Sequence, residues 1–126
     1  MRNLYFCVIC NEPGDVIIDN QKESWCLCQN HLQEFGKEKL ELEGDGYISD
    51  FAALIHENTS CDISGANQNL WRYTTNGLTG RIHIILTYEK LLNLINGRLM
   101  PKEYIKLIEK FGLIKELDIH SNSLNQ

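Results

Sequence analysis

Four side chains that commonly bind metal ions occur in two short pairs near the start of the chain. Cys7 and Cys10 enclose two residues, and 17 residues further on Cys28 and His31 enclose two more. A two-residue gap lets a tight turn, or the first turn of a helix, present both donors to one tetrahedral ion. Three thiolates and one neutral imidazole would fill all four positions, which is typical of a structural zinc site. We therefore expect Cys7, Cys10, Cys28 and His31 to bind zinc.

A neighbouring cysteine leaves one alternative open. Cys26 shares a predicted strand face with Cys28 and could replace it as a ligand. We favour Cys28 because only two residues separate it from His31. The chain holds five cysteines, an odd number, and its opening apolar run is too short for a secretory signal. Both features argue against a disulfide framework and favour a cytoplasmic location.

The residues between and after the two pairs predict the elements that hold the site. An apolar strand, a polar turn and a returning strand give a hairpin over residues 16–27. A helix follows that carries His31, and its apolar face is expected to extend to Leu42, with Gly44 as the stop. The helical face consists of Leu32, Phe35, Lys39 and Leu42.

A knuckle, a hairpin and a helix in this order resemble the treble-clef group of zinc fingers, over about residues 4–35. The segments Cys7-Val8-Ile9-Cys10 and Trp25-Cys26-Leu27-Cys28 are also similar to the knuckle of Gin-type anti-sigma factors. That family uses two CxxC pairs, whereas the second pair here ends in His31. The resemblance implies a structural zinc ion and a function exerted by binding, and inhibiting, a protein partner.

A second hairpin is predicted over residues 70–86, with Asn76 and Gly77 as a type I′ turn. In that register Arg72 lies opposite Arg81 on the face that does not pack. Like charges placed opposite each other destabilise a sheet, but paired guanidinium groups suit a carboxylate or a phosphate. The arginines would either bind a small anionic ligand such as a nucleotide, or point into water or pair with acidic residues elsewhere. The candidate ligand-binding residues are Arg72, Thr74, Thr79, Arg81 and His83.

Three more helices are predicted around this hairpin. The first covers residues 49–57; the second is capped by Thr87 and stops at Gly97. The third begins at Pro101 and ends at Gly112, which suits a left-handed cap. The core stripe of the third helix is expected to be Tyr104, Ile105, Ile108 and Phe111.

Residues 58–69 form a polar loop rich in Asn, Ser and Gly. Loops of this length without secondary structure are uncommon in compact domains, and many carry function. The loop is either a contact surface for a partner or a plain surface connector. The candidate partner residues are Asn58, Ser60, Asp62, Asn67 and Asn69.

The loop also holds Cys61, which raises the alternative of a cysteine-dependent enzyme. Such an enzyme needs a histidine to activate the thiol and a third group to orient the histidine. His56 or His83 could be the base, with Asp62 as the orienting group. One thiol and scattered histidines are weak support, so we expect a protein that is not an enzyme.

The composition of the chain narrows the classes of partner that it could bind. The 126 residues carry 12 basic and 17 acidic side chains, a formal net charge of −5. An excess of Lys and Arg, which binding to nucleic acid requires, is absent. No stretch has the roughly 18 to 20 apolar residues of a membrane helix. Ten of the acidic residues lie within residues 1–50, which favours a protein or small-ligand partner.

These features predict a single α+β domain over residues 1–126. A zinc-knuckle region, residues 1–44, precedes a region with a helix, a hairpin and two C-terminal helices, residues 45–126. The function we expect is that of a small, zinc-stabilised regulator or inhibitor that acts by binding a protein partner.

Overall fold

The protein is a mixed α+β structure built on one antiparallel sheet. The computed structural model describes residues 5–14, 16–42, 47–48, 51 and 59–114. The sheet has the strand order β3-β2-β1-β4-β5, and the α+β prediction is confirmed. The elements along the chain are β1 (Val16–Asp19), β2 (Glu23–Leu27), α1 (Gln29–Gly36), β3 (Tyr47–Ile48), β4 (Leu70–Gly77), β5 (Gly80–Thr87), α3 (Tyr88–Ile95) and α4 (Pro101–Phe111).

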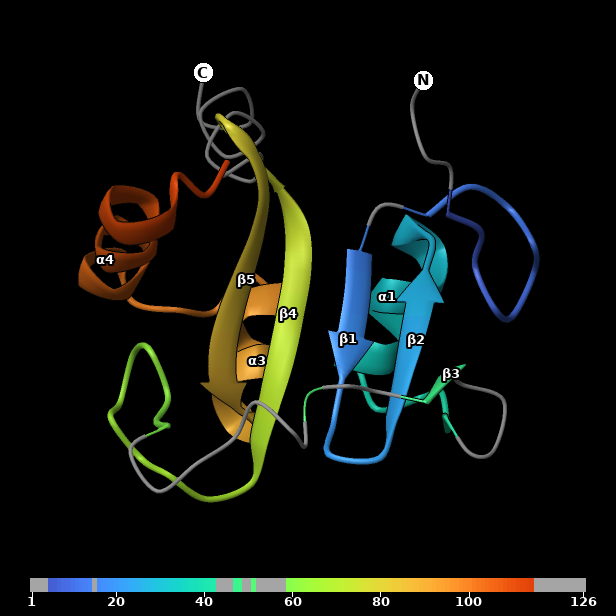
Figure 1. The fold of residues 1–126 in the computed structure, drawn as a ribbon, viewed down its shortest axis with the longest axis horizontal. Coiled ribbons are helices and arrows are strands. Elements are labelled where there is room, and N and C mark those ends of the chain that lie inside the picture. Colours follow the sequence, from blue (N-terminus) through green and yellow to red (C-terminus); the bar gives the residue numbers. More distant parts are fainter. Residues whose placement is uncertain (1–4, 15, 43–46, 49–50, 52–58, 115–126) are drawn as a thin grey trace.

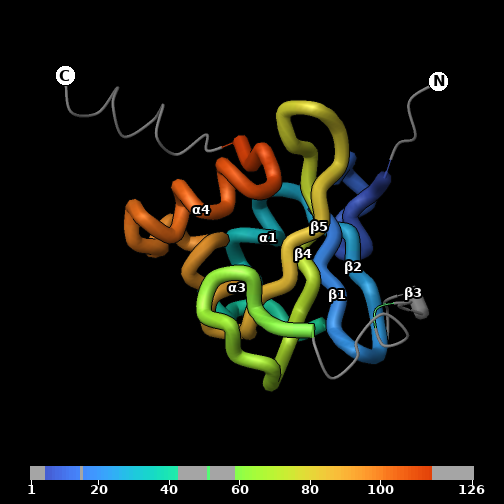
Figure 2. The backbone as a smooth tube through the Cα atoms, turned by 60° about the vertical axis from the view of Figure 1, so that its left-hand side comes forward, coloured from blue at the N-terminus to red at the C-terminus, as the bar shows by residue number. Residues whose placement is uncertain are grey.

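The first hairpin lies beside the second, with β1 paired to both β2 and β4 (Figure 1). One row across the sheet joins Trp25, Ile18, Tyr73 and Ile84. Because paired residues point to the same face, these side chains share one face of the sheet. Figure 2 shows α1, α3 and α4 on one side of the sheet, and β3 pairs with β2 as the strand at the sheet edge.

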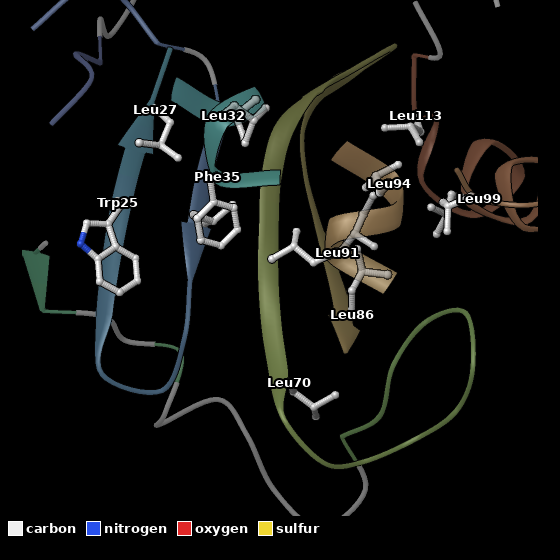
Figure 3. Packing of buried hydrophobic residues seen from close by; sticks show 14 of the residues in the cluster. Trp25, Leu27, Leu32, Phe35, Leu70, Leu86, Leu91, Leu94, Leu99 and Leu113 are labelled. Atoms are coloured by element: carbon white, nitrogen blue, oxygen red, sulfur yellow. The ribbon is translucent and has the colours of Figure 1, made fainter. Parts of the chain in front are cut away.

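The core lies between the sheet and the helices (Figure 3). Trp71 stacks on Trp25 with ring centroids 6.1 Å apart, and Phe35 of α1 lies 5.8 Å from the Trp71 ring. Tyr88 completes the cluster, 5.5 Å from Trp71. Such aromatic contacts add about 0.5–1.5 kcal/mol each beyond burial of their area. They join α1, from the zinc-knuckle region, to β4 and the start of α3.

The helix that carries His31 is shorter than the pattern predicted. α1 ends at Gly36, and Glu38 adopts a left-handed conformation with φ 58°. The N–H of Lys39 bonds to the carbonyl of Glu34, and that of Glu38 to the carbonyl of Phe35. These two bonds form a Schellman cap. The expected stop at Gly44 was wrong because a glutamate occupies the position that usually holds glycine.

The second hairpin forms, but in a different register. Gly77 pairs with Gly80, so Leu78 and Thr79 form the turn instead of Asn76 and Gly77. Two features hold the turn there: the N–H of Leu78 bonds to the carbonyl of Gly112 at 2.9 Å, and Gly80 has a φ of 140°. The turn moves by two residues, and an even shift keeps every side chain on its predicted face.

The C-terminal helices match most of their predicted signals. The Thr87 side chain caps α3 by accepting the Lys90 N–H, Pro101 begins α4, and Gly112 has a φ of 72° in its left-handed cap. The predicted core stripe of α4 is partly wrong. Tyr104 and Leu107 are buried, Ile108 and Phe111 are half-buried, and Ile105 is 53% exposed.

The helix predicted over residues 49–57 lies outside the described residues, except for Phe51. The Phe51 side chain is 1% exposed and belongs to the hydrophobic core. Among the helices of the described ranges, none is long and apolar enough to cross a membrane.

Candidate metal centre

The four predicted ligands converge on one point. The donor atoms of Cys7, Cys10, Cys28 and His31 all lie within 4.8 Å of one another. The Cys10 and Cys28 sulfurs are 3.7 Å apart, and His31 Nδ1 lies 3.2 Å from the Cys28 sulfur and 3.6 Å from that of Cys7. Tetrahedral zinc, with bonds of about 2.3 Å to sulfur and 2.0 Å to nitrogen, places its donors roughly 3.5–3.8 Å apart. The cluster can therefore hold one metal ion, and its geometry is compatible with zinc.

A tight turn places the first two ligands. The N–H of Asn11 bonds to the Cys7 carbonyl at 2.8 Å, and the N–H of Cys7 bonds to the Glu12 carbonyl at 2.7 Å. Asn11 has a φ of 63°, which asparagine tolerates better than most residues. The N–H of Val8 then bonds to the Cys26 carbonyl at 2.9 Å. This bond fixes the turn to β2, next to the second ligand pair.

Close backbone contact lets the turn sit against β2. A Cβ placed on Gly14 would lie 2.6 Å from the carbonyl oxygen of Leu27. No side chain fits at that distance, so glycine is required where the knuckle passes the end of β2.

The second pair is placed by the start of α1. Cys28 is the N-cap residue, and His31 lies in the first turn of the helix. The spacing of three residues brings both side chains to the same end of the helix, since side chains at i and i+3 share a face. The second pair therefore lies at the start of α1, from where both side chains could reach an ion held by the cluster.

The electrostatics of the thiols favour a bound cation. Burial raises the pKa of the Cys7 thiol, but N–H groups of Cys28, Cys10 and Ile9 bond to its sulfur and lower its pKa to about 6. For Cys10, a bond from the Glu12 N–H lowers the pKa, whereas burial and the adjacent Cys28 and Cys7 sulfurs raise it above its ordinary value. Several thiolates in contact repel one another, and a divalent cation removes that repulsion.

The structure also separates the two candidate cysteines of β2. The Cys26 thiol donates to the Gly14 carbonyl at 3.4 Å and does not belong to the cluster. Cys26 and Cys28 lie on the same face of the strand, so the sequence pattern alone left both open. The cluster contains Cys28, the cysteine favoured from the sequence, and does not contain Cys26.

One residue near the metal centre was missed by the sequence analysis. Glu34 lies one turn after His31, and its Oε2 is 3.5 Å from His31 Nε2. A carboxylate on the second ring nitrogen orients a metal-binding histidine and keeps the other nitrogen available to the ion. Here Nδ1 faces the sulfurs. A search for carboxylates three or four residues from His31 would have identified Glu34.

The predicted pair of opposed arginines is not present. In the observed register Arg72 faces Ile85, and Arg81 faces Asn76. Arg72 instead makes two bonds with the carboxylate of Asp19, of 3.0 and 3.2 Å. Asp19 is 1% exposed, so this is a buried ion pair between β4 and β1. The sequence pattern did not single out Asp19 as the partner of Arg72.

The other candidate ligand residues are spread along the hairpin. Thr79 lies in the turn, at the far end from Arg72. Thr74 is buried and its hydroxyl lies 2.9 Å from Nδ1 of His83. Arg81 lies over the Tyr5 ring, 4.8 Å from its centroid. The structure therefore brings Thr74 and His83 together but does not join the two arginines in one site.

The polar loop is attached to β5 through Asp62. The backbone N–H of Asp62 bonds to the Ile85 carbonyl at 2.7 Å, and its carboxylate accepts the Ile85 N–H at 2.8 Å. Lys110 of α4 bonds to the same carboxylate at 2.8 Å. Ser60, Asn67 and Asn69 are exposed, while Asn58 lies outside the described residues. Asp62 is therefore engaged in structure, and the exposed residues leave the partner role of the loop a prediction.

Cys61 lies at the base of this loop and is 3% exposed. Burial raises its pKa, but bonds from Ser64, Ile63 and Thr87 outweigh burial and lower it below the ordinary value. The Ser64 N–H donates to the Cys61 sulfur at 3.4 Å, so the thiol stabilises the turn.

The partners of a nucleophilic cysteine are not assembled around Cys61. The Nδ1 atom of His83 lies against Thr74, and Asp62 bonds to Ile85 and Lys110. The second candidate base, His56, lies outside the described residues. Within the part of the chain that is described, the predicted histidine and aspartate are thus engaged elsewhere.

Comparison of the chain with protein-family models, with curated proteins and with solved structures gives no match.

Proposed function

We propose that this chain is a zinc-stabilised regulator or inhibitor that acts by binding a protein partner, without catalysis of its own. The observation that carries the proposal is the closed donor set. Four candidate ligand atoms lie within 4.8 Å of one another and would fill every position of a tetrahedral zinc ion. A catalytic zinc keeps one position open for water or substrate, so the ion would stabilise the knuckle.

The surface of the knuckle supports a binding role. Tyr5, Phe6 and Ile9 are 37%, 48% and 42% exposed, although all three are large and apolar or aromatic. They occur within five consecutive residues, on the segment that zinc would rigidify. Large apolar side chains gathered on a rigid surface are typical of protein interaction sites. A reducing compartment such as the cytoplasm would keep the thiols available for metal.

The zinc part of the proposal is tested by native mass spectrometry of matched variants. The intact protein should carry one zinc ion, Cys28→Ser should carry none, and Cys26→Ser should keep one. Both variants remove one thiol from the same strand end, so general damage to β2 would affect them alike. Loss of zinc in Cys26→Ser with retention in Cys28→Ser would reverse the ligand assignment.

The partner part is tested by photo-crosslinking in cells that naturally express the chain. A photoreactive phenylalanine analogue replaces Phe6 and, in the control, Ile105. Ile105 is 53% exposed but lies on α4, at the far end of the sheet from the knuckle (Figure 1). A discrete crosslinked protein from position 6 alone is expected. Equal crosslinking from both positions, or none from position 6, would contradict a knuckle-borne interface.

A further inference from the structure

A concavity of about 650 Å³ lies between the knuckle and the sheet face turned away from the helices. Ile17, Ser24 and Cys26 supply its floor from β1 and β2. These side chains alternate with the core residues of the same strands, so they point away from the helices. The walls come from the knuckle, chiefly Tyr5, Phe6 and Ile9. A volume of this size accommodates a large side chain or a small ligand.

The lining is somewhat more apolar than polar. Tyr5, Phe6 and Ile9 are exposed, although excluding water from large apolar side chains is favourable. The polar groups of the lining include the Asn11 and Ser24 side chains and the Tyr5 hydroxyl. An aromatic or aliphatic group therefore suits the concavity better than a sugar or a nucleotide phosphate.

A cation beside the concavity has no counter-ion among the residues that the structure describes. The Arg81 guanidinium lies over the ring of Tyr5, which lines the concavity. Its Nη1 makes one long bond of 3.3 Å to Asn76. Its Nη2 is shielded from water and makes no hydrogen bond within the described ranges of the chain. A buried N–H group of a charged side chain normally has a partner, and one without a partner indicates a missing group.

The other arginine of the same sheet face shows what that group would be. Arg72 makes two bonds to the Asp19 carboxylate, the geometry that guanidinium groups favour. Arg81 has the same chemistry, but no carboxylate in the described part of the chain forms an ion pair with it. A carboxylate supplied from outside the chain would complete it.

We propose that the concavity binds a segment of the protein partner in which an apolar side chain stands next to a carboxylate. The apolar group fills the space between knuckle and sheet, and the carboxylate pairs with Arg81. This inference rests on the proposed function and names the chemistry of its partner. The net charge of −5 and the single arginine at the site disfavour polyanions such as nucleic acids or anionic membranes, which need several cations.

The test uses 3-phenylpropionate as a minimal probe, which combines a ring with a carboxylate. Its neutral isostere, 3-phenylpropanamide, and acetate are the comparison compounds. The zinc-loaded, ¹⁵N-labelled chain is titrated with each, and backbone amide shifts are followed. The amides of Ile9, Asn11 and Ser24 should shift, with the carboxylate about tenfold tighter than the amide, the usual gain from a charged hydrogen bond.

Two variants separate the charge from the fold. Arg81→Gln should abolish the preference for the carboxylate over the amide but keep the shifts of the concavity. Arg98→Gln, which removes an exposed arginine after α3, should behave like the unmodified protein. The spectrum of each variant reports directly whether it is folded.

The outcomes against the proposal are distinct. Equal affinity for the two phenyl compounds in the unmodified chain removes the role of Arg81, and equal affinity for acetate and 3-phenylpropionate removes the apolar part. No shift at the concavity overturns the site as a whole. Zinc content and crosslinking from position 6 are measured independently, so this site can fail while the proposed function stands.

Discussion

At the scale of single residues, the metal centre depends on which donors the backbone turns toward one point. Cys26 and Cys28 have the same chemistry and the same strand face, yet only Cys28 stands at the first turn of α1 beside His31. Cys26 lies two residues earlier and bonds to the backbone of Gly14. The ligand set is thus decided by the position where β2 ends and the helix begins.

Glu34 should tune the affinity of this centre without binding the ion. Its carboxylate lies 3.5 Å from His31 Nε2. Glu34→Gln removes the charge that orients the ring, and zinc affinity should fall by up to about tenfold, the lower end for such outer partners. Competition with a chromophoric chelator measures the change.

The control for Glu34 is Glu41→Gln, an equal change of charge at an exposed position beyond α1. If both variants lower the affinity equally, the effect comes from net charge, and Glu34 has no orienting role.

At the scale of elements, the polar loop and α4 stabilise β5 from outside the sheet. Asp62 bonds to both backbone groups of Ile85 and to Lys110 of α4. The Lys106 ammonium reaches the Ile63 carbonyl at 3.3 Å. The lysines on the outer face of α4 therefore hold the loop in place.

Asp62→Ala should destabilise the fold, because the Ile85 N–H loses its acceptor and Lys110 its counter-ion. The expected loss is about 1–3 kcal/mol in the free energy of unfolding, measured by urea denaturation. Asn67→Ala, at an exposed site in the same loop, should change stability by less than about 0.5 kcal/mol. Similar losses in the two variants would mean that the loop contributes only through its own conformation.

A second element-scale contact predicts a dependence on pH. Glu103 accepts from Lys90 at 2.7 Å and from the Met100 N–H at 2.9 Å, and these bonds hold its pKa below the ordinary 4.5. A lowered carboxyl pKa gives stability that is present above pH 4.5 and is lost as the pH falls through the lower folded value.

Glu103→Gln isolates this contribution. The free energy of unfolding of the unmodified protein should exceed that of the variant by about 1 kcal/mol at neutral pH. The difference should disappear in acid, below pH 4.5. Protonation of the metal ligands affects both proteins and cancels in the comparison. A difference that is constant from pH 7 to pH 3 would contradict the assignment.

The elements also show what could be predicted from the sequence. The types and spacing of the side chains predicted the cluster of candidate metal ligands and the two hairpins. Local capping signals predicted the ends of α3 and α4. The end of α1 was missed because Glu38 adopts the left-handed conformation that glycine usually takes at a helix end, and a glutamate gives no signal of it in the sequence. The turn of the second hairpin moved because Leu78 bonds to Gly112, and local sequence contains no information on that distant contact.

The ion pair of Arg72 was missed for a similar reason. Arg72 meets Asp19 because β1 pairs with β4. The two residues lie 53 positions apart in the sequence. Acidic residues elsewhere in the chain were candidate ion-pair partners for the arginines. Only the order of the strands in the sheet places Asp19 beside Arg72.

At the scale of the whole molecule, the zinc-knuckle region and the C-terminal region share one sheet. β1 lies between β2 and β4, so the hairpin next to the metal centre is part of the sheet interior. The Asp19–Arg72 pair and the stacked Trp25 and Trp71 rings cross the same boundary. Loss of the ion should therefore affect strands far from the ligands.

Removal of zinc with a chelator should loosen both halves of the sheet. Structural zinc contributes directly to folding free energy, and β4 depends on β1 for one of its edges. Hydrogen exchange should accelerate at the amides of β1 and β4, and less at α4. Added zinc should restore protection. Exchange that accelerates only within residues 5–36, with β4 unchanged, would show that the two regions fold independently.

The bonds between Asp62 and Ile85 have a consequence beyond the stability of one molecule. β5 ends the sheet, and a terminal strand with unpaired backbone groups recruits strands from other chains, which leads to aggregation. Asp62 saturates both groups of Ile85, one with its backbone and one with its carboxylate. A single acidic residue thus makes part of this edge unavailable for pairing with a strand of another chain.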